Sequence, residues 1–236
     1  MRNVSFSLTT GVIIFLTVSS FAQSLILINQ PGDPPPKAEL LDGEQQLMKT
    51  QVLPTVRKKL AGDACVEEIN IAGAVNGSFT RAGSNQTLVF YQFCETGNGL
   101  GSAGVFVIDG GKVAANYISA DSGWTIDAKA LPDINKNGLH EVALYYSGGM
   151  HQGQGGTGAD IMEFSSDGLR GIGWFQAGGF DENSEWAYRV TVKPGSRLVF
   201  FQEKWSATGT PGKYRKAGKA VPLKLEPAFG KFEAIK

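Results

Sequence analysis

Short apolar runs separated by glycine and polar residues make up most of the chain from residue 71 onward. The runs are rich in Val, Phe and Tyr, and the 31 glycines of the chain show no collagen-like period. Strands and tight turns are typical of this pattern, and long helices are not. The sequence therefore predicts a mainly β fold of antiparallel strands.

One earlier stretch, residues 37–62, has helical periodicity instead. Its apolar residues recur at fourfold spacing on one face, at Met48, Val52, Val56 and Leu60. Such a stripe usually packs against the rest of a domain. Because Pro54 lacks the backbone N–H that a helix interior uses, we expect it to kink or split this N-terminal helix at about Leu53.

Similar apolar runs recur with a constant step of 55 residues. LVFYQ at Leu88–Gln92 is followed by ALYYS at Ala143–Ser147 and by LVFFQ at Leu198–Gln202. A repeat of this length is typical of stacked β arrays, in which no unit buries its apolar face alone. Residues 63–236 are thus predicted to form three repeats of about 55 residues, either β-propeller-like or as a sandwich. The alternative is that three similar hairpins coincide within one sandwich.

An acidic and amide-rich turn precedes the middle strand. Its oxygen-bearing side chains alternate along the chain, at Asp133, Asn135, Asn137 and Glu141. Calcium binds about six to eight oxygens, which alternate side chains and the backbone carbonyl of Leu139 can supply, while Gly138 permits the sharp turn. The sequence predicts a calcium loop here, with a metal-free Asx turn as the alternative. An EF-hand is excluded, because Leu144 stands where its bidentate Glu is needed.

This turn and the ALYY strand after it resemble an FG-GAP or VCBS-type repeat, the calcium-loop blade of integrin-like β propellers. The resemblance covers one good repeat and two degraded ones. In the first copy, Phe79, Gly83 and Gln86 occupy the positions of Ile134, Gly138 and Glu141. The resemblance implies a propeller-like fold and a structural calcium ion.

The N-terminus has the features of a secretory signal peptide. Arg2 is followed by the apolar run Gly11–Val18 and by a small-residue cleavage signal, so cleavage is expected after Ala22. The Pro-rich residues 23–36 predict a spacer ahead of the helical segment. No later segment has the roughly 20 apolar residues that a membrane span needs. We therefore expect a secreted or periplasmic protein without a transmembrane segment.

Two cysteines, Cys65 and Cys94, suit an oxidising compartment. A bridge between them is the simplest interpretation of an even count. The sequence predicts this disulfide, with two buried free thiols as the alternative.

The formal net charge is zero, so no overall field indicates a specific nucleic-acid partner. The charges are nevertheless uneven, because Lys and Arg predominate after Tyr188. We interpret the basic C-terminal third as a solvated face, and a polyanion-binding surface is the minority alternative.

Glycine-rich segments follow the repeated strands, and we expect them to cluster on one rim, where ligands bind. The predicted contact residues are Met150, His151, Gln152 and Gln154. The favoured function is an exported, non-enzymatic β-repeat module that carries the calcium loop and binds a ligand or partner at a cell surface or envelope.

Two other functions stay open. One is a secreted hydrolase of polysaccharides or esters that uses acids such as Asp121, Asp127 or Asp160. The other is a structural cell-envelope protein anchored by its basic C-terminal third. The four tryptophans, Trp124, Trp174, Trp186 and Trp205, are interpreted as packing residues and not as a sugar-stacking platform.

Overall fold

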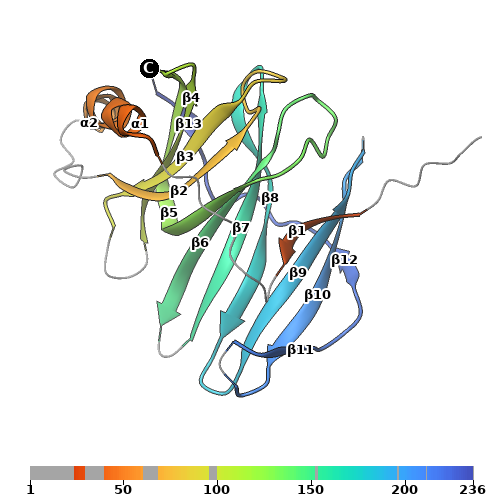
Figure 1. Cartoon of the computed structure of the whole chain (residues 1–236). Helices are drawn as coiled ribbons and strands as arrows, with labels where there is room; N and C mark the ends of the chain where they lie inside the picture. Colours follow the sequence, from red (N-terminus) through yellow and green to blue (C-terminus); the bar gives the residue numbers. More distant parts are fainter. Residues whose placement is uncertain are drawn as a thin grey trace, which may run out of the picture.

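The structure, a computed structural model, describes residues 24–29, 40–60, 69–95, 100–151, 154–195, 197–210 and 212–235, with only the backbone at 28, 29, 100, 121 and 148–151. Its strands pair antiparallel in one extended sheet (Figure 1). The strands are β1 (Leu25–Asn29), β2 (Asn70–Gly77), β3 (Gln86–Phe93), β4 (Leu100–Asp109), β5 (Lys112–Ala130), β6 (Val142–His151), β7 (Gln154–Ser165), β8 (Gly168–Phe180), β9 (Glu185–Lys193), β10 (Val199–Ala207), β11 (Tyr214–Lys216), β12 (Val221–Leu223) and β13 (Glu233–Ala234).

Strands β2 to β10 follow one another across the sheet in chain order. Tight turns produce this meander: Gly110 and Gly111, between β4 and β5, have φ of 57° and 77°, which a two-residue type I′ hairpin requires. Within the described part of the chain the sheet stays open, with β2 and β11 at its ends. The mainly β, antiparallel prediction is confirmed, but these strands do not close into a propeller ring.

The sheet bends along β5, its longest strand. Residues 112–123 of β5 pair with β4, whereas residues 124–130 pair with β6, and the register shifts between Thr125 and Asp127. A bulge of this kind bends a strand and increases its twist. Strands β2–β4 and β6–β8 consequently enclose a core that includes Phe79, Phe90 and Phe164.

The repeated strands β3 and β6 are buried on both faces. In β3, Leu88 and Phe90 enter the core shared with β6–β8, while Val89 and Tyr91 enter a second core beneath the helix. In β6, alternate residues likewise divide between the first core and a third one, which β1, β9 and β10 cover. Burial on both faces explains why these runs are continuously apolar and do not alternate.

The helical segment comprises α1 (Asp42–Leu47), the π-helical turn η1 (Met48–Val52) and α2 (Leu53–Lys59). Val52 and Val56 are fully buried against the sheet, as the stripe predicts. Of the two expectations at Leu53, a kink or a split, the split does not occur. Instead, the π-helical turn runs directly into α2, and Pro54 falls in the first turn of α2, where a missing N–H is tolerated.

Part of the predicted spacer belongs to the fold. Strand β1, within residues 23–36, pairs with β9, and Leu27 is fully buried in the third core. The spacer prediction is therefore wrong for Leu25–Asn29, because this short apolar run covers core residues of β6–β8. The predicted signal peptide, residues 1–22, lies outside the described residues.

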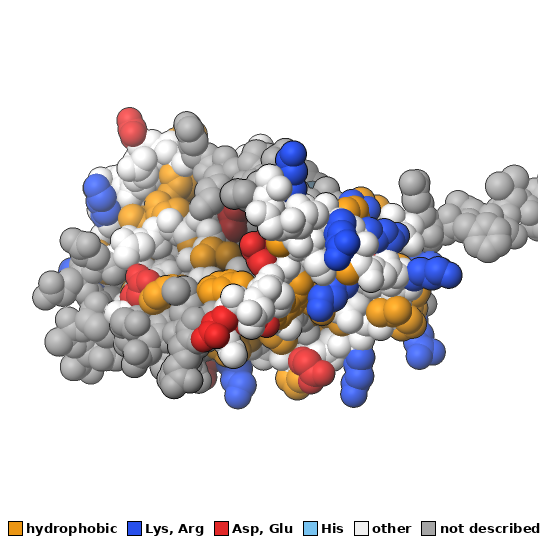
Figure 2. Space-filling view, turned by 90° about the horizontal axis from the view of Figure 1, so that it is seen from below, with side chains coloured by type: hydrophobic (Ala, Val, Ile, Leu, Met, Phe, Trp, Pro, Cys, Tyr) orange, Lys and Arg blue, Asp and Glu red, His pale blue; other side chains and the backbone are white. Residues whose placement is uncertain are grey.

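Basic side chains gather over the C-terminal strands, on the right of the face shown in Figure 2. Glu203 on β10 forms an ion pair with Lys216, and its Oε1 lies 3.9 Å from Nη1 of Arg189. Such partly exposed pairs contribute little to stability. These pairs show that an acidic neighbour offsets part of the positive charge on the basic face.

Candidate functional site

The predicted calcium turn connects β5 to β6 and is closed by its own hydrogen bonds. The carboxylate of Asp133 accepts the N–H groups of Asn137 (3.0 Å) and Gly138 (2.8 Å). The side-chain oxygen of Asn137 accepts the N–H of Leu139 (2.8 Å), and that of Asn135 accepts the N–H of Asn137 (3.0 Å). Gly138 has the positive φ expected of it, 87°. These bonds are those of the Asx turn that the sequence offers as the metal-free alternative.

Glu141 places a buried carboxyl group in this turn. Its side chain is only 1% exposed, and Oε2 accepts the N–H of Ile134 (2.8 Å), but Oε1 has no hydrogen-bond partner among the described residues. Burial raises the pKa of Glu141 to about 7, with the nearby charges of Asp133 and Glu163 adding to the effect. A cation beside Oε1 would offset the free-energy cost of burying this carboxylate, so the residues fit a positive ion.

The donor set, however, is not rich in acids. The described residues contain no group of three or more His, Cys, Asp and Glu side chains that could hold a metal ion. Calcium would therefore need the amide oxygens of Asn135 and Asn137 and the carbonyl of Leu139 in addition to the carboxylates of Asp133 and Glu141. Such an ion would fix the turn in place by joining these oxygens.

The turn before β3 is built in the same way without an acidic residue. Gln86 accepts the N–H groups of Phe79 and Thr80 through Oε1 (both 2.8 Å), as Glu141 accepts that of Ile134. Its Nε2 donates to Thr80 (2.7 Å) and to Asp109 (3.0 Å). The oxygen and the nitrogen of the Gln86 amide therefore both have hydrogen-bond partners. At the equivalent position in the other turn, one oxygen of the Glu141 carboxylate has none among the described residues.

Of the predicted ligand contacts, one is placed at a cavity. Met150 and His151 end β6, but their side chains lie outside the described part, as does the whole of Gln152. Gln154 opens β7, and its side chain lines a cavity of about 570 Å³. The glycine-rich segment after Gln154 is strand and not loop, because residues 154–158 pair with β6 and β8.

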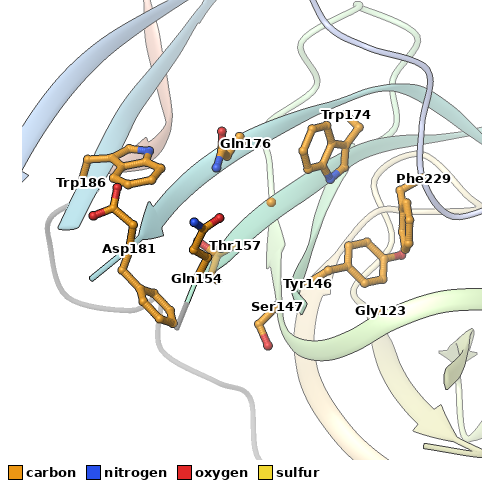
Figure 3. A pocket seen from close by; sticks show the side chains of 14 residues that line it. Gly123, Tyr146, Ser147, Gln154, Thr157, Trp174, Gln176, Asp181, Trp186 and Phe229 are labelled. Atoms are coloured by element: carbon orange, nitrogen blue, oxygen red, sulfur yellow. The ribbon is translucent and has the colours of Figure 1, made fainter. Parts of the chain in front are cut away.

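The cavity combines aromatic and polar side chains (Figure 3). Its aromatic side chains are those of Tyr146, Trp174, Phe180, Trp186 and Phe229. Its polar side chains are those of Ser147, Gln154, Thr157, Gln176 and Asp181. A volume of this size lies in the range of about 300–1,000 Å³ that small-molecule sites have.

Glycines allow the two indoles to lie directly on the sheet. A Cβ at Gly158 would come within 2.4–2.5 Å of three ring atoms of Trp174, and one at Gly179 would lie 2.6 Å from the ring of Trp186. No larger residue leaves room for these rings at the same positions. The glycine-rich character of this segment therefore has a structural cause beyond turn formation.

Phe229 reaches the cavity from the C-terminal segment, which Asp160 holds. The carboxylate of Asp160, fully buried on β7, accepts the N–H groups of Phe229 (2.7 Å) and Gly230 (2.6 Å). Burial raises the pKa of Asp160 to about 6, although both N–H bonds oppose the shift. The ring of Phe229 packs edge-on against Tyr146, with centroids 5.5 Å apart.

The other acids considered for a hydrolase do not gather in the cavity. Asp127 is buried and accepts the N–H of Ala128 (2.8 Å), and the side chain of Asp121 lies outside the described part. Asp181 lines the cavity, but its carboxylate accepts the N–H groups of Asn183 and Ser184. These contacts make the described acids structural hydrogen-bond acceptors.

The sequence favours packing for Trp174 and Trp186, but both line the cavity and both remain partly exposed. The available signal was the glycine pattern on the adjacent strands, which leaves space for rings on one face of the sheet.

The predicted disulfide is only partly described. No free cysteine occurs among the described residues, but Cys65 lies outside them. The Cys65–Cys94 pairing stays a prediction.

Comparison with models of known protein families, with curated proteins and with solved structures finds no match. In the described portion, none of the helices has the length and apolar character to cross a membrane.

Proposed function

We propose that this protein is an exported, non-enzymatic β module that binds a ligand in the cavity between β6, β7, β8 and β9. The observation that carries the proposal is the joint lining of one cavity by Gln154, by two indoles and by Phe229 from a distant segment. Pockets that combine apolar walls with a few convergent polar groups are the usual small-molecule sites of proteins.

Binding is favoured over hydrolysis because of how the acids are used. Hydrolysis by two carboxylates needs one general acid and one nucleophile or base, both facing the substrate. The carboxylates of Asp160 and Asp181 are instead engaged by backbone N–H groups. A turnover assay on polysaccharides and esters tests the alternative. Hydrolysis that disappears in Asp160→Asn or Asp181→Asn, with the fold intact, would establish the enzyme instead.

The binding proposal is tested by a fragment screen with two-dimensional NMR. Ligands are expected to shift the indole N–H resonances of Trp174 and Trp186 and to leave that of Trp205 unchanged. Trp205 is a matched control, because it lies on β10 and its Nε1 donates to Glu203 (3.0 Å), away from the cavity. A screen in which fragments shift none of these resonances would oppose the proposal.

We further propose that residues 133–141 hold a structural calcium ion, as the resemblance to FG-GAP or VCBS repeats implies, and that the 55-residue step records a duplication. The unpaired Oε1 of Glu141 supports the ion, and the shared hydrogen bond of the two turns supports the duplication. Calorimetric titration of chelator-treated protein should give heat that saturates at one site. Asp133→Ala should abolish it, whereas Asp167→Ala, in the β7–β8 turn, should not.

Export is tested through processing of the full chain. The mature protein recovered from the periplasm or medium of a bacterial host is expected to begin at Gln23. If the basic C-terminal strands anchor the protein to an envelope polymer, binding to anionic polysaccharide should weaken steeply with salt. Salt-insensitive or absent binding would leave the cavity as the proposed contact.

A further inference from the structure

The charges around the cavity restrict what it can bind. Among the described lining residues, Asp181 is the only charged one, and its carboxylate is already engaged within its own turn. Phosphate and sulfate groups are normally met by Arg, Lys or a helix N-terminus, and the described lining offers none of these. One cation lies beside the lining: Nζ of Lys204 is 5.3 Å from the ring centroid of Trp186. The cavity therefore favours an uncharged ligand.

The polar groups call for a ligand rich in hydroxyls. The amides of Gln154 and Gln176 each offer donors and an acceptor, and both side chains are exposed. Figure 3 shows Gln176 between Trp174 and Trp186, so that a polar group alternates with two ring surfaces. Ser147 and Thr157 add hydroxyl groups to the same lining.

The indoles supply broad apolar surfaces beside these polar groups. Each is backed by a glycine of the neighbouring strand, so its position is fixed before any ligand arrives. Rigid aromatic residues bind at low entropic cost because few torsions are lost. Saccharides have apolar C–H faces edged by hydroxyls. This alternation matches the arrangement in the cavity, where the rings of Trp174 and Trp186 flank the amide of Gln176. The Nε2 of Gln176 donates to the carbonyl of Gly178 (3.3 Å), which leaves its side-chain oxygen to accept a hydrogen bond from a ligand, and a purely apolar ligand would not use it.

We propose, on the basis of the binding function above, that the cavity takes a neutral oligosaccharide. Its sugar faces pack on Trp174 and Trp186, and its hydroxyls bond to the amides of Gln154 and Gln176. Phe229 bounds the far end of the site, where Asp160 fixes the backbone of the C-terminal segment. The occupant is a short chain and not a single ring, because aromatic side chains line the cavity on both sides of Gln176 (Figure 3).

The test uses the mature chain and calorimetry with neutral oligosaccharides, namely gluco-, manno- and chito-oligomers, and with acidic uronic-acid oligomers. At least one neutral oligomer should bind, and Trp174→Ala and Trp186→Ala should each weaken it about tenfold or more. Trp205→Ala, the control on β10, should bind as the wild type does. If removing an indole disrupts folding, the exposed amides Gln154→Ala and Gln176→Ala provide the same test.

Three outcomes overturn the proposal, and they separate it from the binding function. If only acidic oligomers bind, and Lys204→Met abolishes this binding, the ligand is anionic and not neutral. If no saccharide binds, but N-phenylnaphthylamine binds and Trp174→Ala abolishes that binding, the saccharide proposal is refuted and the cavity is still a binding site. If neither probe binds and no fragment shifts the indole resonances, both proposals fail.

Discussion

Replacing Gly158 with alanine tests whether glycine is needed to seat Trp174. The added methyl would lie 2.4–2.5 Å from three atoms of the indole, whereas carbon atoms normally approach to about 3.5–4.0 Å. The backbone at Gly158 has little freedom to move, because it pairs with Tyr146 on β6 and with Gln176 on β8. The ring must therefore shift by about 1 Å or more.

The expected cost combines two opposing effects. Overpacking of this kind destabilises by about 1–3 kcal/mol. Replacing glycine with alanine also restricts the unfolded chain, which stabilises the protein by about 0.4–1 kcal/mol. The net loss should be about 0.5–2 kcal/mol in the free energy of unfolding. Gly218→Ala measures the second effect alone, because a Cβ at Gly218 meets no atom within 4 Å and φ is not positive there.

Urea unfolding followed by circular dichroism provides the measurement, and a double-mutant cycle isolates the clash. In a Trp174→Ala background the ring is gone, so Gly158→Ala should be neutral or slightly stabilising. The coupling between the two changes should reach about 1 kcal/mol, as expected for residues in direct contact. An equal cost of Gly158→Ala with and without the indole would refute the reasoning.

Three further substitutions test other parts of the fold. Tyr91→Phe should cost about 1–2 kcal/mol in urea unfolding, because it removes the 3.0 Å bond to the buried carboxamide of Asn116; an unchanged midpoint would contradict this. Burial raises the pKa of Asp160 to about 6 from 3.8, so the folded state binds this proton more tightly than the unfolded state. The free energy of unfolding should therefore fall as pH rises from about 4 to about 6, by at most about 3 kcal/mol, and Asp160→Asn should remove that slope. Gly43→Ala, exposed in α1 with no atom within 4 Å of its Cβ, should raise the free energy of unfolding by up to about 1 kcal/mol, and a decrease would oppose a helix there.

The fold class and the helix could be predicted because each depends on local periodicity. Val52 and Val56 lie four residues apart, and this spacing determines which helix face is buried whatever it packs against. The π-helical turn could not be predicted in the same way, because Pro54 is compatible with either a break or a continuous helix. Strand β1 was missed because its run is short and precedes four prolines; only its distant partner β9 makes it a strand.

The turn at residues 133–141 and the cavity differ in how much the sequence could reveal. Asp133 and Gly138 lie within one turn, so their spacing alone predicts the Asx hydrogen bonds that the structure contains. The cavity joins Gln154 and Trp174 to Phe229, which is more than fifty residues further along the chain. No local pattern reports that the C-terminal segment returns to β7, because this depends on the buried carboxylate of Asp160.

The same pairing of glycine with an aromatic ring has different consequences in the two halves of the sheet. At Gly104 a Cβ would lie 2.0 Å from the ring of Tyr91, which is fully buried because the helix covers that face. At Gly158 the ring of Trp174 is seated in the same way, but it stays partly exposed beside a cavity. Glycine therefore fixes the ring in both places, and only the layer above decides whether that ring packs a core or faces a cavity. For this reason Trp174 looks like a packing residue in the sequence, and the binding role proposed for it depends on the absence of a covering layer over the described part of this face.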